Sequence, residues 1–446
     1  MSESLSFTQR PKIIVIDDDP TGSQTVHSCL LLLKWDVATL KQGLLDDSPI
    51  FFILANTRSL TPAEAERTTL EVCNNLKQAL AETNTQDYLV VSRSDSTLRG
   101  HYPLETDMLA AELGPFDAHF MVPAFFEAGR VTVDSIHYIE ADGVRTPVHE
   151  TEFAKDSVFG YTYSYLPDYV AEKTAQKIAP DQVKRFTLDV IRQDTTAQLM
   201  ALDNNVCVAV DAQKQSDLDR FSQDLLAVAS QGKKFLFRSA ASLLTSLAAL
   251  PPQPIAADMM SRYTRNKKPG VVLVGSHVQK TTLQLNYLLQ QPGVVGLEVD
   301  VVCLKEDSSQ ASAMVTEILI QVQTVYEQGK TAVVYTSRRE LTFGDVTTRL
   351  AFGEAVSNLL MDIVRGLPSD VGFLISKGGI TSNDTLSKGL ALTSARLLGQ
   401  VIPGVSVVTT GGDHPQFPNL PVVLFPGNVG GDDAVAAAYK RMSATQ

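Results

Sequence analysis

Short apolar runs rich in β-branched and aromatic residues recur along this chain, and longer segments with helical spacing separate them. In the first half, the runs lie at 12–16, 50–54, 88–91, 119–122, 207–210 and 235–237. Apolar runs without polar alternation are typical of strands that are buried on both faces of a parallel sheet. Because helical segments alternate with these runs, the sequence predicts βαβ units and an α/β fold.

The segment after the second run carries a clear helix start. Thr61 and Glu64 have the spacing of a capping box, and Pro62 occupies the first helical position. Apolar residues then recur at helical spacing as far as Leu80. We therefore predict a helix over residues 61–82.

A polar stretch that contains several prolines, Pro251 to Pro269, interrupts this alternation. The chain has 446 residues, more than a single hydrophobic core usually supports. We predict two α/β domains, a substrate domain at 1–255 and a nucleotide-binding domain at 270–446. Their largely parallel sheets are expected to face each other across a cleft.

A second α/β series follows the boundary. The expected strands are 271–274, 332–335, 373–375, 405–408 and 422–425, and the expected helices lie near 281–290, 309–327, 354–365 and 433–441. The segment from Phe125 to Tyr169 fits neither series. It is either a surface excursion or a small extra hairpin, and long irregular segments of this kind often carry function.

Composition and charge exclude several classes of protein. With 44% hydrophobic and 20% charged residues the chain is globular, and its net charge of −12 argues against nonspecific nucleic-acid binding. The beginning of the chain lacks a signal-peptide core and no run approaches the ~18 apolar residues of a membrane span. We expect a cytoplasmic protein without a membrane partner, with its four cysteines as buried thiols. The histidines lack metal-binding spacing, so no metal site is assigned.

Two motifs in the first half follow expected strands and combine carboxylates with an arginine. IIVIDDDPTGSQT contains Asp17, Asp18 and Asp19, and SRSDSTLRGHYPLE contains Asp95 and Arg99. Carboxylates at the carboxyl end of a strand can meet a hydroxylated substrate or a metal, and Arg is the natural partner of a planar carboxylate. The alternatives are that the aspartates form an Asp-rich turn that caps the next element, and that Asp95 only caps a helix while Arg99 pairs on the surface.

Two more expected strand ends carry arginines. Arg58 lies in NTRSL and Arg130 ends PAFFEAGR. Because the carboxyl ends of parallel strands meet at one edge of a sheet, four such motifs predict a pocket for a polyhydroxylated carboxylate.

The second half carries three glycine-rich turns between strands and helices. They contain Ser276, the run Lys377-Gly378-Gly379-Ile380-Thr381, and Gly427 with Gly430. Glycines allow a backbone to approach phosphates, hydroxyls and helix N-terminal N–H groups bind the anion, and Lys377 could offset its charge. None matches a Walker A or GxGxxG pattern, and each alone could be plain turn chemistry. Together they predict a nucleotide site.

The ordered motifs DDDPTG, SDSTLRG, PAFFEAGR, GSH, KGGITS and PGNVGG resemble the four-carbon acid sugar kinase family over nearly the whole chain. The resemblance implies ATP-dependent phosphorylation of a hydroxyl on a threonate-, erythronate- or oxo-tetronate-like acid. By motif position, Asp18, Asp19, Asp95 and Arg99 look like substrate-site residues with Asp17 beside them. Ser276, the turn 378–381 and Gly427 look like nucleotide contacts. Members commonly have an acidic residue where this chain has Ile380, and Lys-Ser where it has Phe425-Pro426.

The resulting hypothesis is that ATP binds the glycine turns with Mg²⁺ bridging its phosphates. Arg99, helped by Arg58 or Arg130, would anchor the acid, and one of Asp18, Asp19 and Asp95 would accept the hydroxyl proton. The expected partners are the sugar acid, ATP and a second copy in a homodimer, without nucleic acid. Two alternatives stay open: a haloacid-dehalogenase-like phosphatase that uses Asp17 as nucleophile, and a non-catalytic sugar-acid-binding protein of the same fold.

Overall fold

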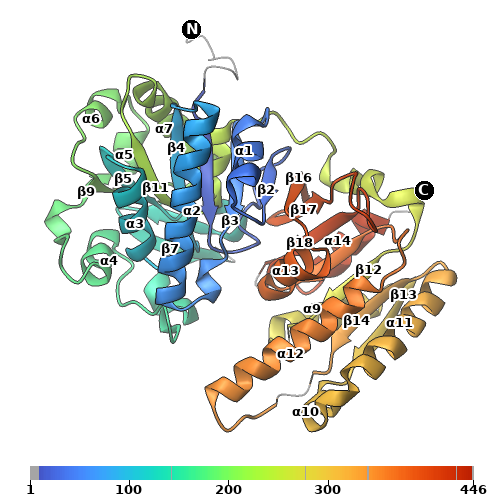
Figure 1. The fold of residues 1–446 in the computed structure, drawn as a ribbon. Helices are drawn as coiled ribbons and strands as arrows, with labels where there is room; N and C mark the ends of the chain where they lie inside the picture. The colour runs from blue at the N-terminus through green and yellow to red at the C-terminus, as the bar shows by residue number, and fades with distance from the viewer. Residues whose placement is uncertain (1–9, 142, 277, 339–340, 428, 444–446) are drawn as a thin grey trace. The chain divides into compact units, whose positions relative to one another are not determined.

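The structure is a computed structural model that describes residues 10–141, 143–276, 278–338, 341–427 and 429–443. The chain divides into two compact units, Met1–Pro251 and Pro252–Gln446 (Figure 1). The division falls at the start of the proline-bearing stretch. A cleft between the two sheets stays a prediction.

The N-terminal unit is built on a sheet whose paired strands all run parallel. Its order is β2-β3-β1-β4-β11-β5-β10-β9. The strands are β1 (Lys12–Asp17), β2 (Leu30–Leu32), β3 (Ile50–Leu54), β4 (Tyr88–Arg93), β5 (Ala118–Val122), β9 (Lys184–Phe186), β10 (Val206–Val210) and β11 (Phe235–Ser239). All six strands predicted for this half are present.

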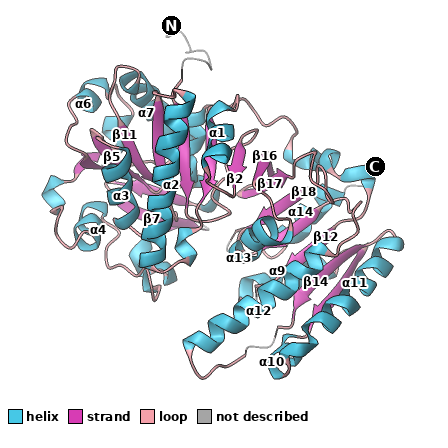
Figure 2. Ribbon diagram, viewed as in Figure 1, coloured by secondary structure: helices cyan, strands magenta, loops and turns pink. Residues whose placement is uncertain are grey.

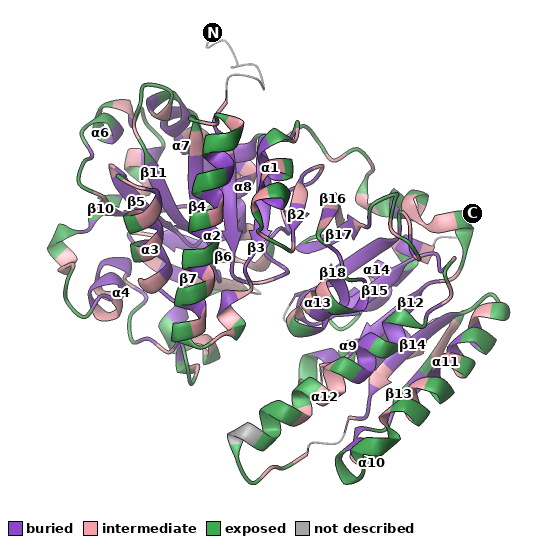
Figure 3. Cartoon of the chain, in the orientation of Figure 1, coloured by how far each residue is buried: buried purple, intermediate pink, exposed green. Residues whose placement is uncertain are grey.

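Helices connect these strands and cover the sheet (Figure 2). They are α1 (Val37–Leu45), α2 (Pro62–Thr83), α3 (Leu104–Leu113), α4 (Leu166–Lys173), α5 (Leu188–Ile191), α6 (Thr196–Met200), α7 (Gln215–Ala229) and α8 (Ala241–Ala248). Helix α2 begins as predicted, since Thr61 and Glu64 form the capping box and Pro62 is its first residue. Its outer face is exposed while the strands beneath are buried (Figure 3).

The segment that fits neither predicted series contains a separate antiparallel sheet of β6 (Arg130–Val133), β7 (Ile136–Ala141) and β8 (Val144–Pro147). The extra-hairpin interpretation of this segment is therefore confirmed, with one strand more than a simple hairpin. Short 3₁₀ turns at Val148–Glu150 and Glu152–Lys155 follow it and lead to α4.

The C-terminal unit has the strand order β13-β14-β12-β15-β18-β17-β16. The strands are β12 (Val271–Val274), β13 (Val294–Val299), β14 (Thr331–Thr336), β15 (Leu374–Lys377), β16 (Ser394–Ile402), β17 (Val405–Thr409) and β18 (Pro421–Phe425). Along this order, the neighbouring strands from β13 through β14, β12 and β15 to β18 are parallel. Strand β17 is antiparallel to both of its neighbours, β18 and β16. Gly404, at φ +76°, lies in the tight turn that joins β16 to β17, a connection that only antiparallel strands allow.

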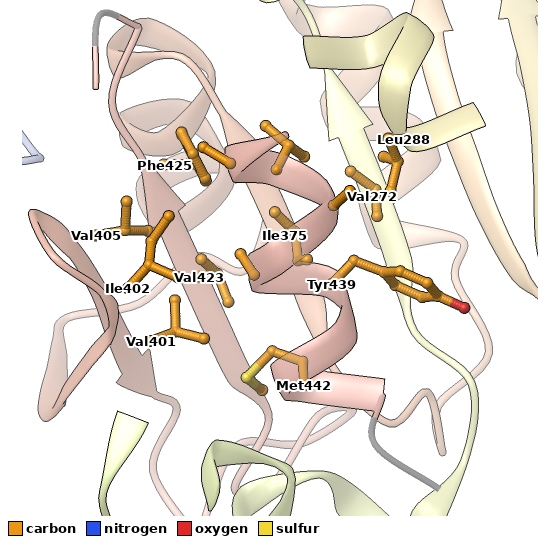
Figure 4. Packing of buried hydrophobic residues seen from close by; sticks show 14 of the residues in the cluster. Val272, Leu288, Ile375, Val401, Ile402, Val405, Val423, Phe425, Tyr439 and Met442 are labelled. Atoms are coloured by element: carbon orange, nitrogen blue, oxygen red, sulfur yellow. The ribbon is translucent and has the colours of Figure 1, made fainter. Parts of the chain in front are cut away.

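The helices of this unit are α9 (Gln279–Leu289), α10 (Val301–Glu306), α11 (Ala311–Glu327), α12 (Val346–Arg365), α13 (Gly379–Asp384) and α14 (Ala434–Ser443). Tyr439 and Met442 of α14 pack on Val272, Ile375 and Val423 of the sheet (Figure 4). In the described part of the chain, no helix is long and apolar enough to cross a bilayer. Cys29, Cys73 and Cys207 are buried, but the interpretation of Cys303 as buried is wrong because it is exposed on α10.

Candidate functional site

The site motifs of the N-terminal unit meet because neighbouring parallel strands end at the same edge of its sheet. Asp17 ends β1 and pairs in register with Arg93, which ends β4. Arg58 lies in the 3₁₀ turn Thr57–Ser59, directly after β3, and Asp95 lies directly after β4. Adjacent strands thus bring the first three motifs together.

Arg58 connects the aspartates of two motifs. Its Nε and Nη2 lie 3.0 and 2.5 Å from the two carboxylate oxygens of Asp18, a bidentate pair. Its Nη1 lies 3.5 Å from Asp19 Oδ2 and 3.6 Å from Asp95 Oδ1. Arg58 is therefore neutralised by the protein's own carboxylates.

Arg99 is held in the same way. Its Nε donates to Asp95 Oδ2 at 2.8 Å, and its Nη1 lies 3.7 Å from Asp156 Oδ2. Burial alone would raise the pKa of Asp95, but Arg58 and Arg99 outweigh it and hold that pKa well below its usual range. Asp95 is therefore a stable anion that fixes two arginines.

Arg130 differs from these two arginines. Its guanidinium lies 5.9 Å from the ring centroid of Phe153, and that of Arg99 lies 5.0 Å from the same ring. Arg130 donates to the Ala128 carbonyl, while its Nε is buried without a hydrogen-bond partner. In the described part of the chain it forms no ion pair with a carboxylate. Of the three arginines predicted from the sequence, Arg130 is the one without a carboxylate at ion-pair distance among the described residues, although Asp95 still acts on its charge from further away.

Asp17 lies behind the other aspartates and is fully buried. A Cβ on Gly22 would come within 2.1 Å of both Asp17 carboxylate oxygens, so only glycine fits at that close approach. Burial raises the pKa of Asp17 to about 8, an effect that Arg93, with Nη1 3.4 Å from Asp17 Oδ1, only partly offsets. Asp17 Oδ1 accepts a hydrogen bond from the Asp19 N–H at 3.3 Å, so the carboxyl group supports the loop that carries Asp18 and Asp19.

The buried carboxyl group of Asp17 predicts a pH dependence of stability. Its folded pKa of about 8 lies above the ordinary 3.8, so its stabilising contribution is complete below the unfolded pKa and is lost as the pH rises through 8. We expect the free energy of unfolding to fall more steeply between about pH 5 and pH 8 in the wild type than in Asp17→Asn. Urea unfolding across this range measures both slopes. Asp87→Asn, an exposed control, should keep the wild-type slope, and parallel slopes for Asp17→Asn would contradict the assignment.

Sequence reasoning missed several charged side chains at this edge. Glu105 of α3 accepts a hydrogen bond from Thr57 Oγ1 at 2.5 Å, and burial together with Asp18 raises its pKa to about 7. Arg93 is the last residue of the apolar strand β4, Arg238 is the last but one of β11, and both are buried. A charged residue at the end of an otherwise apolar run was the signal that could have identified both.

In the C-terminal unit, the glycine turns follow β12, β15 and β18, which are neighbours in the sheet. Gly378 has φ +114° and donates its N–H to the Phe425 carbonyl at 2.8 Å. A Cβ on Gly378 would lie 3.6 Å from Ser276 Cβ and 3.5 Å from Thr381 Oγ1, and one on Gly275 would lie 2.6 Å from Thr381 Oγ1. The first two turns are thus in direct contact.

Lys377 joins the second turn to the third. Its side chain is buried, and its Nζ donates to the carbonyls of Pro426 and Gly427 at 2.6 and 3.2 Å. Burial, with a contribution from Lys280, lowers its pKa to about 7. Lys377 therefore holds two backbone turns together, and its role in offsetting phosphate charge stays a prediction.

The remaining predicted residues of this unit differ in exposure. Ile380 is 71% exposed, and a Cβ on Gly427 would meet nothing within 4 Å. Gly430 has φ +78° and packs on Ala434 at the start of α14. This contact gives Gly430 a structural role in the turn. His277 and Asn428, which belong to two of the quoted motifs, lie outside the described residues.

Two family models match the chain. One, described as a sugar-binding N-terminal domain, covers residues 13–247, and the other, a nucleotide-binding C-terminal domain, covers residues 271–435. The chain belongs to the four-carbon acid sugar kinase family. Among curated relatives of this kinase family, it is 26% identical over 456 residues to a D-erythronate kinase of Heliobacterium modesticaldum, covering 95% of each chain.

Solved structures agree with the family's fold. A Salmonella typhimurium LT2 protein to which a tRNA synthase activity has been attributed is 20% identical, with a TM-score of 0.71 over 97% of this chain and 98% of that one. The Haemophilus influenzae protein HI1011 is 18% identical, with a TM-score of 0.64 over 96% of this chain and all of that one. At these identities the likeness concerns the fold alone.

Proposed function

We propose that this chain is an ATP-dependent kinase that phosphorylates a hydroxyl of a small sugar acid, with threonate- or erythronate-like four-carbon acids as the substrate class. The observation that carries the proposal is the pairing of two motif clusters, each at one edge of its own sheet, in units that match a sugar-binding and a nucleotide-binding domain. The relationship to a D-erythronate kinase supports the same activity.

In this proposal, Arg130 anchors the substrate carboxylate. Arg58 and Arg99 already pair with aspartates, so an incoming carboxylate would have to compete with them. Arg130 is half-buried, forms no ion pair with a carboxylate among the described residues and lies beside the same Phe153 ring as Arg99. A desolvated guanidinium without a partner is a favourable site for a planar anion.

Asp19 is the proposed acceptor for the hydroxyl proton. Its side chain is 21% exposed, whereas those of Asp18 and Asp95 are 2% and 10% exposed. The backbone N–H of Thr21 donates to Asp19 Oδ1 at 2.8 Å, which fixes the carboxylate and leaves Oδ2 toward Arg58 at 3.5 Å. Asp18 and Asp95 then act by holding Arg58 and Arg99 in place.

The glycine turns fit a triphosphate by their chemistry. Gly378 provides a backbone conformation that side chains rarely allow, Ser276 and Thr381 provide hydroxyls beside it, and Gly427 leaves open space. ATP would supply the phosphoryl group. Mg²⁺ would be held mainly by the phosphates of ATP, as is usual for this ion.

The phosphatase alternative is less consistent with the geometry of Asp17. A nucleophilic aspartate must be ionised and accessible to a phosphate ester. Asp17 is fully buried beneath Gly22, and its raised pKa keeps it protonated at neutral pH.

The proposal is tested with a panel of C4 to C6 aldonic and oxo-acids, supplied with ATP and Mg²⁺ and followed by coupled detection of ADP. We expect acid-dependent ADP formation with a four-carbon member. Phosphate release from phosphorylated acids without ATP would favour the phosphatase, and acid binding without turnover would favour the non-catalytic protein.

Gly378→Ala should weaken nucleotide binding. An L side chain at φ +114° is strained, so the turn should shift and the KM for ATP should rise about tenfold. The KM for the sugar acid should stay unchanged, because the substitution lies in the other unit. Gly344→Ala, where a Cβ would meet nothing within 4 Å, is the matched control. A tenfold rise in both KM values would contradict the assignment.

A further inference from the structure

The turn that carries Asp95 and Arg99 contains a strained residue. Leu98 is fully buried and has φ +69°, in the left-handed region that side-chain-bearing residues rarely adopt. Gly100, two residues later, has φ +119°, and a Cβ there would lie 3.2 Å from Asp18 Oδ2. Strained backbone of this kind persists only where surrounding contacts determine it. The turn must therefore be held from outside.

Two tyrosines hold consecutive carbonyl groups of this turn. Tyr161 Oη donates to the Thr97 carbonyl at 2.7 Å, and Tyr169 Oη donates to the Leu98 carbonyl at 2.7 Å. Both tyrosines are buried, and their rings meet edge to face at 5.5 Å. These two hydroxyls therefore fix the backbone on both sides of the strained residue.

A histidine holds the preceding carbonyl. His137 of β7 is fully buried, with Nε2 2.7 Å from the Ser96 carbonyl and Nδ1 2.9 Å from Thr132 Oγ1. A carbonyl only accepts, so Nε2 carries the hydrogen, and Nδ1 of the neutral ring accepts from the threonine hydroxyl. Burial lowers the pKa of His137 to about 4, which agrees with a neutral donor.

An arginine completes the set. Arg238, at the end of β11, donates from Nη2 to the carbonyls of Leu98 and Arg99, each at 3.2 Å. Its guanidinium lies 5.1 Å from the ring centroid of Tyr102 and 5.8 Å from that of Tyr169. Four successive carbonyls, from residue 96 to residue 99, thus accept hydrogen bonds from buried side chains of four separate segments.

We propose that Tyr161, Tyr169, His137 and Arg238 are positioning residues that hold this turn in its strained conformation and thereby set the affinity for the sugar acid. The inference rests on the proposed function. In the described part of the chain none of the four forms a hydrogen bond or ion pair with the side chain of Asp95 or Arg99, so they act through the backbone between them. The segment that fitted neither predicted series, Phe125 to Tyr169, supplies three of the four.

Tyr169→Phe tests this with the smallest change, because it removes one hydroxyl and keeps the ring packing. Loss of one hydrogen bond to a buried carbonyl should raise the KM for the sugar acid about tenfold and leave the KM for ATP unchanged. Tyr161→Phe should behave alike. A variant that merely folded less well would lose kcat with both KM values intact, and that result would overturn the proposal.

Tyr165→Phe is the matched control, since its ring contacts Arg185 and, among the described hydrogen bonds, its hydroxyl donates to none of the carbonyls of residues 96–99. Hydrogen exchange of peptides covering residues 94–101 gives a second readout that needs no activity. Exchange should accelerate in Tyr169→Phe and Tyr161→Phe and match the wild type in Tyr165→Phe. Unchanged exchange in the first two variants would overturn the positioning role. A wild type that phosphorylates no sugar acid would instead refute the proposed function, and the exchange rates would still decide whether these side chains hold the turn.

Discussion

Arg130→Ala is expected to raise the KM for the sugar acid about 100-fold, the equivalent of about 3 kcal/mol. The substitution leaves the substrate carboxylate without a partner in a half-buried position, and the aspartates around Arg58 and Arg99 then repel it. The KM for ATP should change little. Steady-state kinetics with each substrate varied in turn measures both constants.

Arg145→Ala is the matched control, because Arg145 lies on β8 of the same small sheet and pairs with Glu140 at an exposed position. It should leave both KM values near those of the wild type. Arg130→Lys should recover part of the lost affinity through its charge. Equal effects of Arg130→Ala and Arg145→Ala would refute the role of Arg130 as the anchor.

Asp19→Asn is expected to lower kcat by a factor on the order of 10³, within the usual range for loss of a positioned proton acceptor. The amide has the size of the carboxylate but cannot accept the proton, so the KM for the acid should change only a few-fold. Burial would raise the pKa of Asp19, but Arg58, Arg93 and hydrogen bonds from Thr21 outweigh it and lower that pKa. Asp19 should therefore stay ionised through the usual titration range of an aspartate, so its protonation should not be what lowers kcat there.

Asp87→Asn, at an exposed position of the same unit, provides the control for Asp19→Asn and should retain full activity. A kcat for Asp19→Asn within a few-fold of the wild type would assign the proton to another group. Asp95→Asn distinguishes a proton acceptor from a residue that holds the arginines. Loss of the charge that holds Arg58 and Arg99 should raise the KM for the acid, whereas loss of a proton acceptor should lower kcat.

The sequence predicted the buried strands well because their apolar runs are unambiguous. Strands β13 and β16 escaped prediction since their residues alternate between buried and more exposed positions, which reduces the apolar signal to scattered residues. Helix α12 begins at Val346, earlier than the predicted 354, because Asp345 caps it by accepting from the Thr348 N–H.

The sequence predicted which residues belong to the candidate site better than it predicted which of them pair with one another. Parallel strands with polar ends identify which residues share an edge, and Arg58, Asp18 and Asp95 do lie together. Periodicity cannot indicate which arginine is neutralised by its neighbours, since that depends on side-chain geometry. Nor could it identify Tyr169 or Arg238, whose hydrogen bonds cross 71 and 140 residues of sequence.

The small antiparallel sheet of β6, β7 and β8 has a consequence for how selectivity can change. Arg130 begins it and the neighbouring Phe153 and Asp156 follow it, whereas Asp18 and Asp19 belong to loops of the large sheet. Under the proposed roles, recognition of the acid group and acceptance of the hydroxyl proton are thus encoded in different stretches of the gene. Exchange between relatives of the segment that contains β6, β7, β8 and the turns after them could change the length of the acid that is bound. The loop that carries Asp18 and Asp19 would stay unchanged.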